Sequence, residues 1–95
     1  MSANLNNLGA IASRMNEIES AIVYYNAALE IRRQIEYHEG IAKTLYNLAH
    51  VWAEIGHLTE TQTLLEEAVE LDRRYGFANL ARDQAALERV RRHLA

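Results

Sequence analysis

Three residues near the middle of the chain have types and spacing that could bind a metal ion. They are His50, Glu54 and His57, at positions i, i+4 and i+7. Imidazole and carboxylate groups are common zinc ligands. The metal-binding helix of metalloproteases, however, requires the order His-Glu-x-x-His, which does not occur in this sequence. We therefore interpret these residues as surface side chains, with His57 in a turn, and predict no metal site.

The sequence also lacks the usual signatures of other catalytic chemistry. It contains no cysteine, which excludes a disulfide, a thiolate metal site and a cysteine nucleophile. It contains neither a glycine-rich phosphate-binding loop nor a recognisable Ser-His-Asp arrangement. We predict a protein that is not an enzyme and that uses no cofactor and no small-molecule substrate.

A repeated pair of asparagines is the other polar feature that could take part in binding. Asn7 lies in the stretch Leu5–Gly9 (LNNLG), and Asn47 lies in Leu45–Ala49 (LYNLA), forty residues later. An amide side chain offers both a hydrogen-bond donor and an acceptor. The spacing alone shows two polar residues at equivalent positions, which can face a partner, face solvent or bond to helix ends.

Length and composition predict one small helical domain over residues 1–95. The chain has no proline and only four glycines, and it is rich in Ala, Leu, Glu and Arg. Its apolar runs are too short to cross a bilayer, and the N-terminus lacks a signal-peptide pattern. We expect a cytoplasmic protein without a membrane partner.

Charge is distributed unevenly along the chain. The net charge of −3 argues against a general nucleic-acid binder. Residues 1–72 carry four basic and eleven acidic side chains, whereas residues 73–95 carry six arginines and two acidic side chains. Arg89, Arg91 and Arg92 either complement the dipole at the C-terminus of the last helix or form a basic patch for an acidic partner or a second subunit.

The helical spacing of apolar residues predicts five helices. Asn16 and Gly56 lie forty residues apart, and both residue types readily adopt the left-handed conformation that closes a helix. The same turn is therefore predicted twice, and a period of about forty residues with two helices per unit indicates an α-solenoid. The expected boundaries are a first helix ending near Asn16, helices at about 18–37 and 41–55 separated by a break at Gly40, a fourth helix from a Thr59–Gln62 capping box to Gly76, and a fifth at about 79–93.

Each repeat unit carries a pattern of apolar and small residues. The second unit has Leu45, Leu48, Ala49 and Trp52, then Thr61, Leu65 and Ala68; the first has Leu5, Leu8, Gly9 and Ala12, then Ala21, Tyr25 and Ala28. This pattern resembles the tetratricopeptide repeat family, in particular its longer-period branch typified by kinesin light chain. The resemblance implies two repeats, at about 2–39 and about 40–76, with Trp52 as the buried aromatic residue of the second. The sequence departs from the pattern at Ala12, Thr61 and Leu65 and lacks a proline between the repeats.

The last segment, at about 79–94, is predicted to be a capping helix. It keeps an apolar stripe at Leu80, Leu87, Val90 and Leu94. Its other face is polar, because Gln84, Glu88 and Arg91 stand where the second repeat has Leu45, Ala49 and Trp52. A helix with one polar face is what a solenoid needs at its end, so we expect residues 79–94 to close the C-terminal edge.

The family resemblance implies a concave groove, lined by the first helix of each repeat, that holds extended peptides or partner helices. In that groove Asn7 and Asn47 would clamp a peptide backbone. Lys43, Arg82 and Arg89 would favour an acidic peptide, but Ala86 replaces a third asparagine, so we do not predict a complete carboxylate clamp. By position, the expected groove residues are Asn6, Asn7, Arg14, Lys43, Tyr46, Asn47, His50, Glu54, Arg82 and Arg89.

These observations predict a protein–protein interaction module that binds a peptide or a partner protein, as an adaptor does. One alternative is self-association into homo-oligomers through the solenoid ends. In that arrangement the arginines of the last helix would meet Glu66, Glu67 or Glu70 of another copy. A further alternative is a scaffold domain of a larger regulatory protein.

Overall fold

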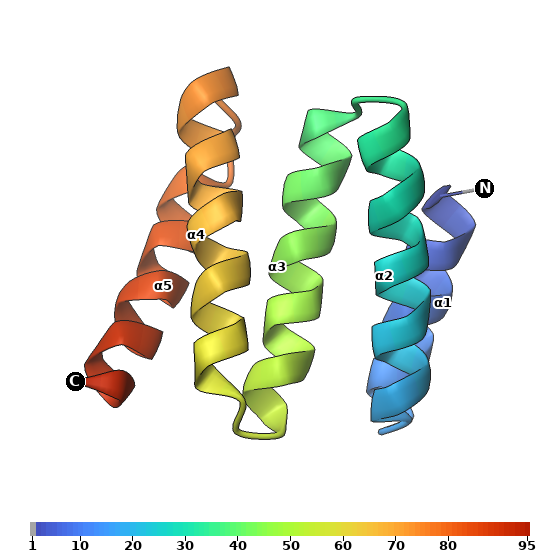
Figure 1. Ribbon diagram of the computed structural model, residues 1–95, viewed down its shortest axis with the longest axis horizontal. Coiled ribbons are helices and arrows are strands. Elements are labelled where there is room, and N and C mark those ends of the chain that lie inside the picture. The colour runs from blue at the N-terminus through green and yellow to red at the C-terminus, as the bar shows by residue number, and fades with distance from the viewer. Residues whose placement is uncertain (1) are drawn as a thin grey trace.

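The computed structural model describes residues 2–95, and within them the regular secondary structure consists of five α-helices, with no strand (Figure 1). The predicted all-α fold is confirmed. The helices follow one another as antiparallel neighbours, joined by short turns. Their bounds are α1 Ser2–Arg14, α2 Ile18–Gln34, α3 His38–Glu54, α4 Leu58–Tyr75 and α5 Leu80–Leu94.

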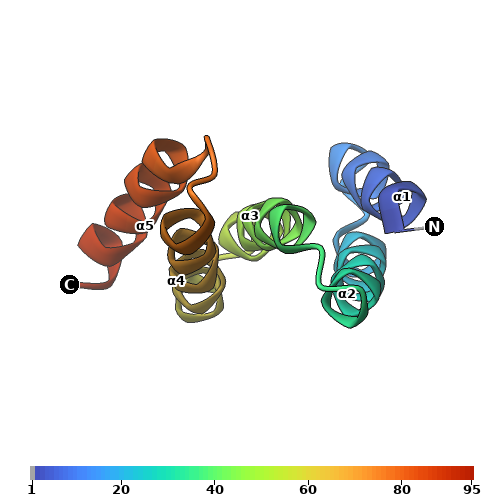
Figure 2. The same ribbon diagram turned by 90° about the horizontal axis from the view of Figure 1, so that it is seen from above.

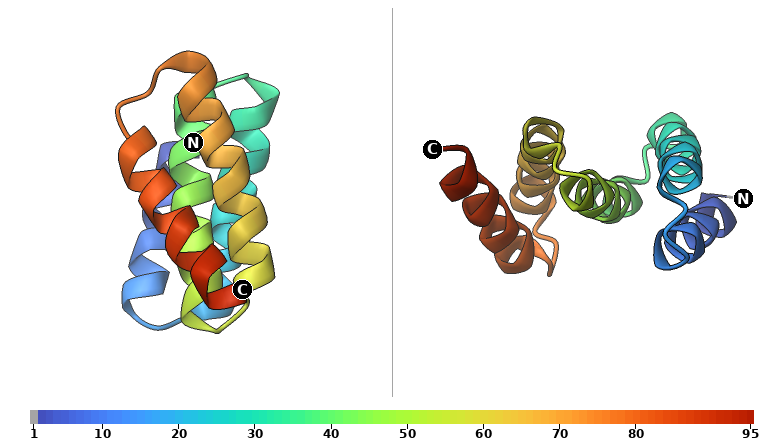
Figure 3. Two further views of the ribbon diagram at one scale, coloured as in Figure 1. Left: turned by 90° about the vertical axis from the view of Figure 1, so that its left-hand side faces the viewer. Right: turned by 90° about the horizontal axis from the view of Figure 1, so that it is seen from below.

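The five helices form two layers. Seen from above, α1, α3 and α5 lie along one side and α2 and α4 along the other (Figure 2). In this view α1 and α5 both project beyond α3 on the side away from α2 and α4, so this layer is concave. The view from below shows the same curvature (Figure 3). The molecule measures 36 × 31 × 17 Å, which is the shape of a short solenoid two helices thick.

The predicted turn after the first helix of each repeat is confirmed. Asn16 has a φ of 60° and Gly56 a φ of 80°, so two different residues adopt the left-handed conformation at equivalent places. Gly76 does the same at the end of α4, with a φ of 69°. Asparagine and glycine tolerate this conformation best, which explains why the chain uses them there.

The predicted break at Gly40 is wrong. Gly40 is buried within the first turn of α3, and the turn is made instead by Glu36, whose φ is 55°. The helices therefore end at Gln34 and begin again at His38, rather than near residues 37 and 41. Gly40 serves a close approach: a Cβ there would lie 2.4 Å from a ring carbon of Tyr37 and 2.9 Å from Cδ of Arg32.

The predicted capping box at Thr59 and Gln62 is also wrong. Gly56 adopts the left-handed conformation, His57 follows it, and α4 begins at Leu58. Thr59 is therefore already inside the helix. Thr61, which is buried, is the threonine that forms hydrogen bonds at the start of α4. Its hydroxyl lies 2.8 Å from the His57 carbonyl and 3.3 Å from the Ala49 carbonyl, and so links α4 to α3.

Small residues allow the helices to pack closely, as the repeat pattern predicted. A Cβ on Gly9 would lie 2.7 Å from the ring of Tyr25, which is itself only 3% exposed. The ring cannot give way, so α1 approaches α2 only because this position has no side chain. Ala28, Ala49 and Ala68 are likewise buried.

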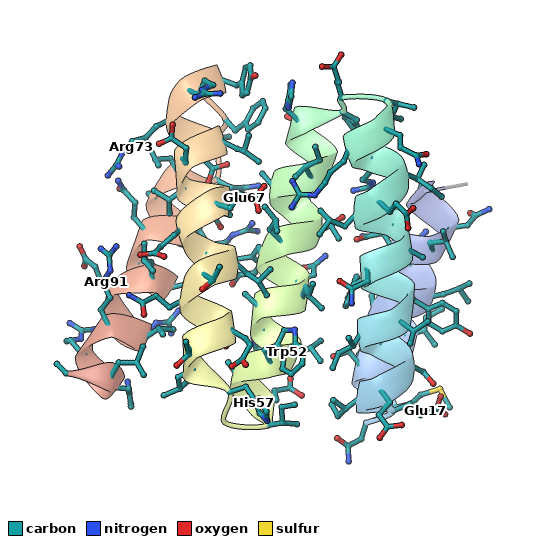
Figure 4. All side chains as sticks on the ribbon, in the orientation of Figure 1. Glu17, Trp52, His57, Glu67, Arg73 and Arg91 are labelled. Atoms are coloured by element: carbon teal, nitrogen blue, oxygen red, sulfur yellow. The ribbon has the colours of Figure 1, made fainter. Side chains whose placement is uncertain are left out.

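Trp52 is not the fully buried aromatic residue that the pattern predicted. It is half-buried at the edge of a core cluster that contains Tyr25, Leu48 and Val51. Its ring lies beside that of His57 at the turn between α3 and α4, with 5.1 Å between the ring centroids (Figure 4). Position at the end of a helix, next to an open turn, leaves part of the indole exposed.

Helix α5 has the two-sided character expected from its sequence. Leu87 and Val90 are buried against α4, whereas Glu88 and Arg91 are exposed. Arg91 pairs with Glu66 of α4, with 3.3 Å between Nη2 and the carboxylate oxygen.

Candidate interaction surface

A cavity of about 540 Å³ lies on the concave side between α3 and α5. The intervening helix α4 forms its floor through Leu58, Thr61 and Leu65. The walls are polar where the cavity opens and apolar toward α4, with Ala49 and Val90 among the apolar lining residues. Such a combination of apolar floor and polar rim suits a side chain of a bound polypeptide.

Three of the predicted groove residues, Tyr46, His50 and Arg89, line this cavity. Arg82 lies next to them, with its guanidinium carbon 3.8 Å from the centre of the Tyr46 ring, which is close enough for a cation–π contact. The Nε of Arg82 also donates a hydrogen bond to Oδ1 of Asp83 at 3.1 Å. Arg82 is thus held in place by both helices and bridges the groove.

The predicted residues of α1 lie outside this cavity, because α1 is on the far side of α3. Asn7 and Arg14 are exposed. Asn6 is half-buried, and its side-chain oxygen accepts a hydrogen bond from the Thr44 hydroxyl at 3.1 Å, so it already links α1 to α3.

Burial raises the pKa of the Tyr25 phenol, and the positive charge of Arg14 offsets part of that effect.

The remaining predicted residues are on α3. Asn47 is half-buried. Lys43 lines a separate, smaller cavity and lies 3.9 Å from a carboxylate oxygen of Glu39. Glu54 lies one helical turn after His50 and pairs with it, with 3.0 Å between Nε2 of His50 and Oε1 of Glu54.

The histidines at the foot of α3 are held in two separate pairs. His50 lies against Glu54, whereas His57 lies 3.6 Å from Glu60 of α4. Among residues 2–95 no three His, Cys, Asp or Glu side chains are grouped as metal ligands.

The sequence reasoning missed two buried carboxyl groups, Asp72 and Asp83. Asp72 is 1% exposed and Asp83 0% exposed, and both line the smaller cavity of about 140 Å³. Burial raises the pKa of Asp72 to about 7, assisted by the hydrogen bond and the negative charge of Asp83 and opposed by Arg82. Alignment of Asp83 with Thr44 and of Asp72 with Arg32 was the available signal, but polar residues at helix ends are usually exposed.

Glutamates expected to meet another copy already have partners within the chain. Glu67 is bound by both guanidinium nitrogens of Arg33, at 2.6 and 2.9 Å. Glu66 pairs with Arg91, and Glu70 lies 3.6 Å from the guanidinium of its helical neighbour Arg74. Figure 4 shows Glu67 on α4 and Arg91 on α5.

A family model described as tetratricopeptide repeat matches residues 1–74, which contain α1 to α3 and all but the last residue of α4. The chain belongs to the tetratricopeptide repeat family. Repeats of this family generally mediate protein–protein interaction and are typically not enzymes. No curated protein matches the chain. In the part of the chain that the structure describes, none of the helices has the length and apolar character needed to span a membrane.

Proposed function

We propose that this protein binds a peptide or an extended segment of a partner protein along its concave side, as a member of the kinesin-light-chain-like branch of the family. The observation that supports this most is the cavity of about 540 Å³ between α3 and α5. It lies on the layer where a groove was expected, and three of the expected residues line it. The proposal includes a cytoplasmic location, which microscopy of a tagged chain would test.

The lining suggests how a partner would be held. An apolar side chain would enter between α3 and α5 and cover Ala49, Leu58 and Leu65, which form apolar wall and floor. An acidic group beside it would meet Arg89, which is exposed at the rim. Asn7 and Asn47 would contribute hydrogen bonds to the peptide backbone farther along the concave layer.

Partner capture from a native lysate, compared between the wild-type chain and groove variants, tests the proposal. Ala86→Trp fills the cavity from α5, and Asn7→Ala combined with Asn47→Ala removes the amides; both are expected to abolish capture while the far-ultraviolet circular dichroism spectrum is retained. Val23→Ala is the control, because Val23 is 65% exposed on α2 and outside the groove. Capture that survives both groove variants would refute the assignment.

Self-association is a second candidate, and one observation favours it. Leu8, Ile11 and Met15 on α1 are 42%, 45% and 64% exposed, whereas Leu48 and Val51, the equivalents of the first two, are buried at 2% and 1%. In the second repeat α2 covers these positions; on α1 they form an open apolar stripe that a second copy would cover. Sedimentation over a concentration series tests this, and a monomer at every concentration would exclude it.

A further inference from the structure

A pair of carboxyl groups is buried where the first turn of α5 meets the end of α4. Asp72 is 1% exposed and Asp83 is 0% exposed, and the two carboxyl groups are hydrogen-bonded to each other. A hydrogen bond between two carboxyl groups needs a proton on one of them, because two ionised carboxylates offer no donor. The contact between α4 and α5 at this place therefore depends on a bound proton.

The chain offers these carboxyl groups few other donors. Within the described residues, Arg82 donates from Nε to Oδ1 of Asp83 at 3.1 Å, whereas the remaining oxygens of the pair meet no N–H donor. From α3, Lys43 lines the adjacent cavity but lies 3.9 Å from the carboxylate of Glu39, and the α4–α5 loop adds no titratable side chain. Loss of the proton thus leaves two facing negative charges beside one guanidinium, which is costly in a buried place.

The equivalent interface one repeat earlier has no such dependence. Arg32 stands forty residues before Asp72, and its Nη1 donates to the Gly40 carbonyl at 2.9 Å and to the Thr44 hydroxyl at 3.2 Å. A guanidinium is not deprotonated in proteins, so this contact keeps its charge. A change of pH near neutrality therefore acts on the buried charges between α4 and α5 and not on those between α2 and α3.

Helix α5 is the element that can respond to this change. It is packed on one side only, where Leu87 and Val90 are buried against α4, and its opposite face is exposed. It is joined to α4 through Gly76, which is exposed, has a φ of 69° and has open space where a Cβ would lie. A helix with few buried side chains beside an open glycine turn belongs to the parts of a protein that open most easily.

Arg82 connects the buried pair to the groove cavity. Its guanidinium carbon lies 3.8 Å from the centre of the Tyr46 ring on α3, while its Nε is bonded to Asp83. Helix α5 also supplies a wall of the cavity of about 540 Å³, through Arg89 and Val90 among others. A displacement of α5 from α4 would therefore move that wall and break the contact between Arg82 and Tyr46.

We propose that the Asp72–Asp83 pair is a proton-dependent latch that holds α5 against α4 and thereby regulates the groove between α3 and α5. With the proton, α5 is docked; without it, α5 is released more often. The inference rests on the proposed function, since the groove is what the latch regulates. Burial raises the pKa of Asp72 from 3.8 to about 7, so docking weakens as pH rises between these values and changes little above them.

Amide hydrogen exchange of the full chain, followed by nuclear magnetic resonance from pH 5 to pH 8, tests the latch without a partner. The protection factor of the Leu87 amide on α5 should fall roughly tenfold or more over this range. At pH 8 it should lie at least tenfold below that of Ala28 on α2, because α5 opens while the rest stays folded. The nuclear Overhauser effect between Arg82 and Tyr46 should weaken over the same range.

Asp72→Asn separates the latch from other effects of pH. The asparagine amide can donate to Asp83 as a protonated carboxyl does, and it cannot ionise, so protection of Leu87 should no longer fall as pH rises. The matched control is Glu70→Gln, which removes a charge on the exposed face of α4 and should behave like the wild type.

Three outcomes would overturn the proposal. They are protection of Leu87 that is constant with pH in the wild type, that falls equally in Asp72→Asn, or that equals the protection of Ala28 at pH 8, which would indicate a single global unfolding. An Arg82–Tyr46 contact that is unchanged from pH 5 to pH 8 would overturn the link to the groove. Since no partner is needed, failed capture by the groove leaves these results intact, and the two proposals can fail separately.

Discussion

Two equivalent helix–helix interfaces differ in one buried charge: we call the α2–α3 interface the first joint and the α4–α5 interface the second joint. The last buried residue of α2 at the first joint is Arg32, and the equivalent residue of α4 at the second joint is Asp72. The two outer helices are otherwise alike: residues 21–32 and 61–72 follow the same order of buried, half-buried and exposed positions. Facing them are Thr44 on α3 and Asp83 on α5, both fully buried. The repeat thus preserves the geometry of the joint and reverses its charge.

The difference teaches that two solenoid joints of the same geometry can bury opposite charges and depend on different partners within the chain. Arg32 fills its site and donates to two acceptors on α3. Asp72 instead faces Asp83, and burial raises the pKa of Asp72 to about 7, assisted by the hydrogen bond and the negative charge of Asp83. Below that pH a protonated Asp72 can donate a hydrogen bond to Asp83; above it an ionised Asp72 is repelled by the negative charge of Asp83. The following predictions test this contrast.

The largest effect is expected from Arg32→Met. The change removes a buried guanidinium and leaves the Gly40 carbonyl without its side-chain donor, so the free energy of unfolding should fall by roughly 2–4 kcal/mol. Arg33→Met is the matched control: its ion pair with Glu67 is exposed and should contribute less than about 1 kcal/mol. Urea unfolding of both variants measures this. Equal losses would mean that Arg32 does not hold the first joint.

The second prediction concerns the pH dependence of stability at the second joint. The folded-state pKa of Asp72, about 7, lies above its ordinary value of 3.8, so the folded state binds the extra proton between these values. Its contribution therefore falls as pH rises, and on the order of 3 kcal/mol should be lost between pH 5 and pH 8.

Urea unfolding of Asp72→Asn at several pH values measures that contribution, because the amide cannot ionise. The free energy of unfolding of the variant should exceed that of the wild type most at pH 8, and this difference should shrink toward pH 5. Glu70→Gln, exposed on the same helix, corrects for general charge effects. A difference that is the same at every pH would contradict the buried-pair explanation.

A smaller effect on stability is expected when position 72 is given the arginine that the equivalent position 32 carries. Asp72→Arg places a guanidinium opposite Asp83, and the adjacent cavity of about 140 Å³ gives it room. Since buried ion pairs are close to neutral in stability, we expect a change within about 1–2 kcal/mol at pH 7. The pH dependence attributed to Asp72 should vanish. A large loss of stability would show that the two joints are not interchangeable.

The smallest effect is expected from Asn6→Ala. This residue accepts a hydrogen bond from Thr44, and the hydroxyl keeps Arg32 as a second partner after the change. We expect a loss of about 0.5–1.5 kcal/mol. Asn7→Ala, one residue along and exposed, is the control and should be close to neutral. A larger loss at position 7 than at position 6 would show that the α1–α3 link is wrongly assigned.

Much of the architecture could be predicted because it depends on local patterns. The positions of Asn16, Gly56 and Gly76 identified three turns, since few other residues adopt a positive φ at low cost. Gly40 misled the same reasoning: a glycine can also serve a close approach inside a helix, and only the packed Tyr37 reveals which role applies. Thr59 misled it likewise, because α4 begins at Leu58, so Thr59 lies within its first turn and not at the N-cap position.

The groove was predicted only in part. Tyr46, His50 and Arg89 line its cavity as placed by the repeat. The engagement of Asn6 with Thr44 could not be anticipated, because that contact joins helices thirty-eight residues apart in the chain. Nor could the partial exposure of Trp52, which depends on how the turn at His57 leaves the indole uncovered.

The sequence by itself determined the number of helices, the forty-residue period and the polar outer face of the last helix. These follow from the spacing of apolar and small residues, which acts through neighbours along the chain. The tertiary structure alone decided which polar residues are buried. Arg32 and Asp72 are both charged residues near a helix end, and their fate depends on the helix that packs over them: α3 offers Arg32 two acceptors, whereas α5 faces Asp72 with a second carboxyl group.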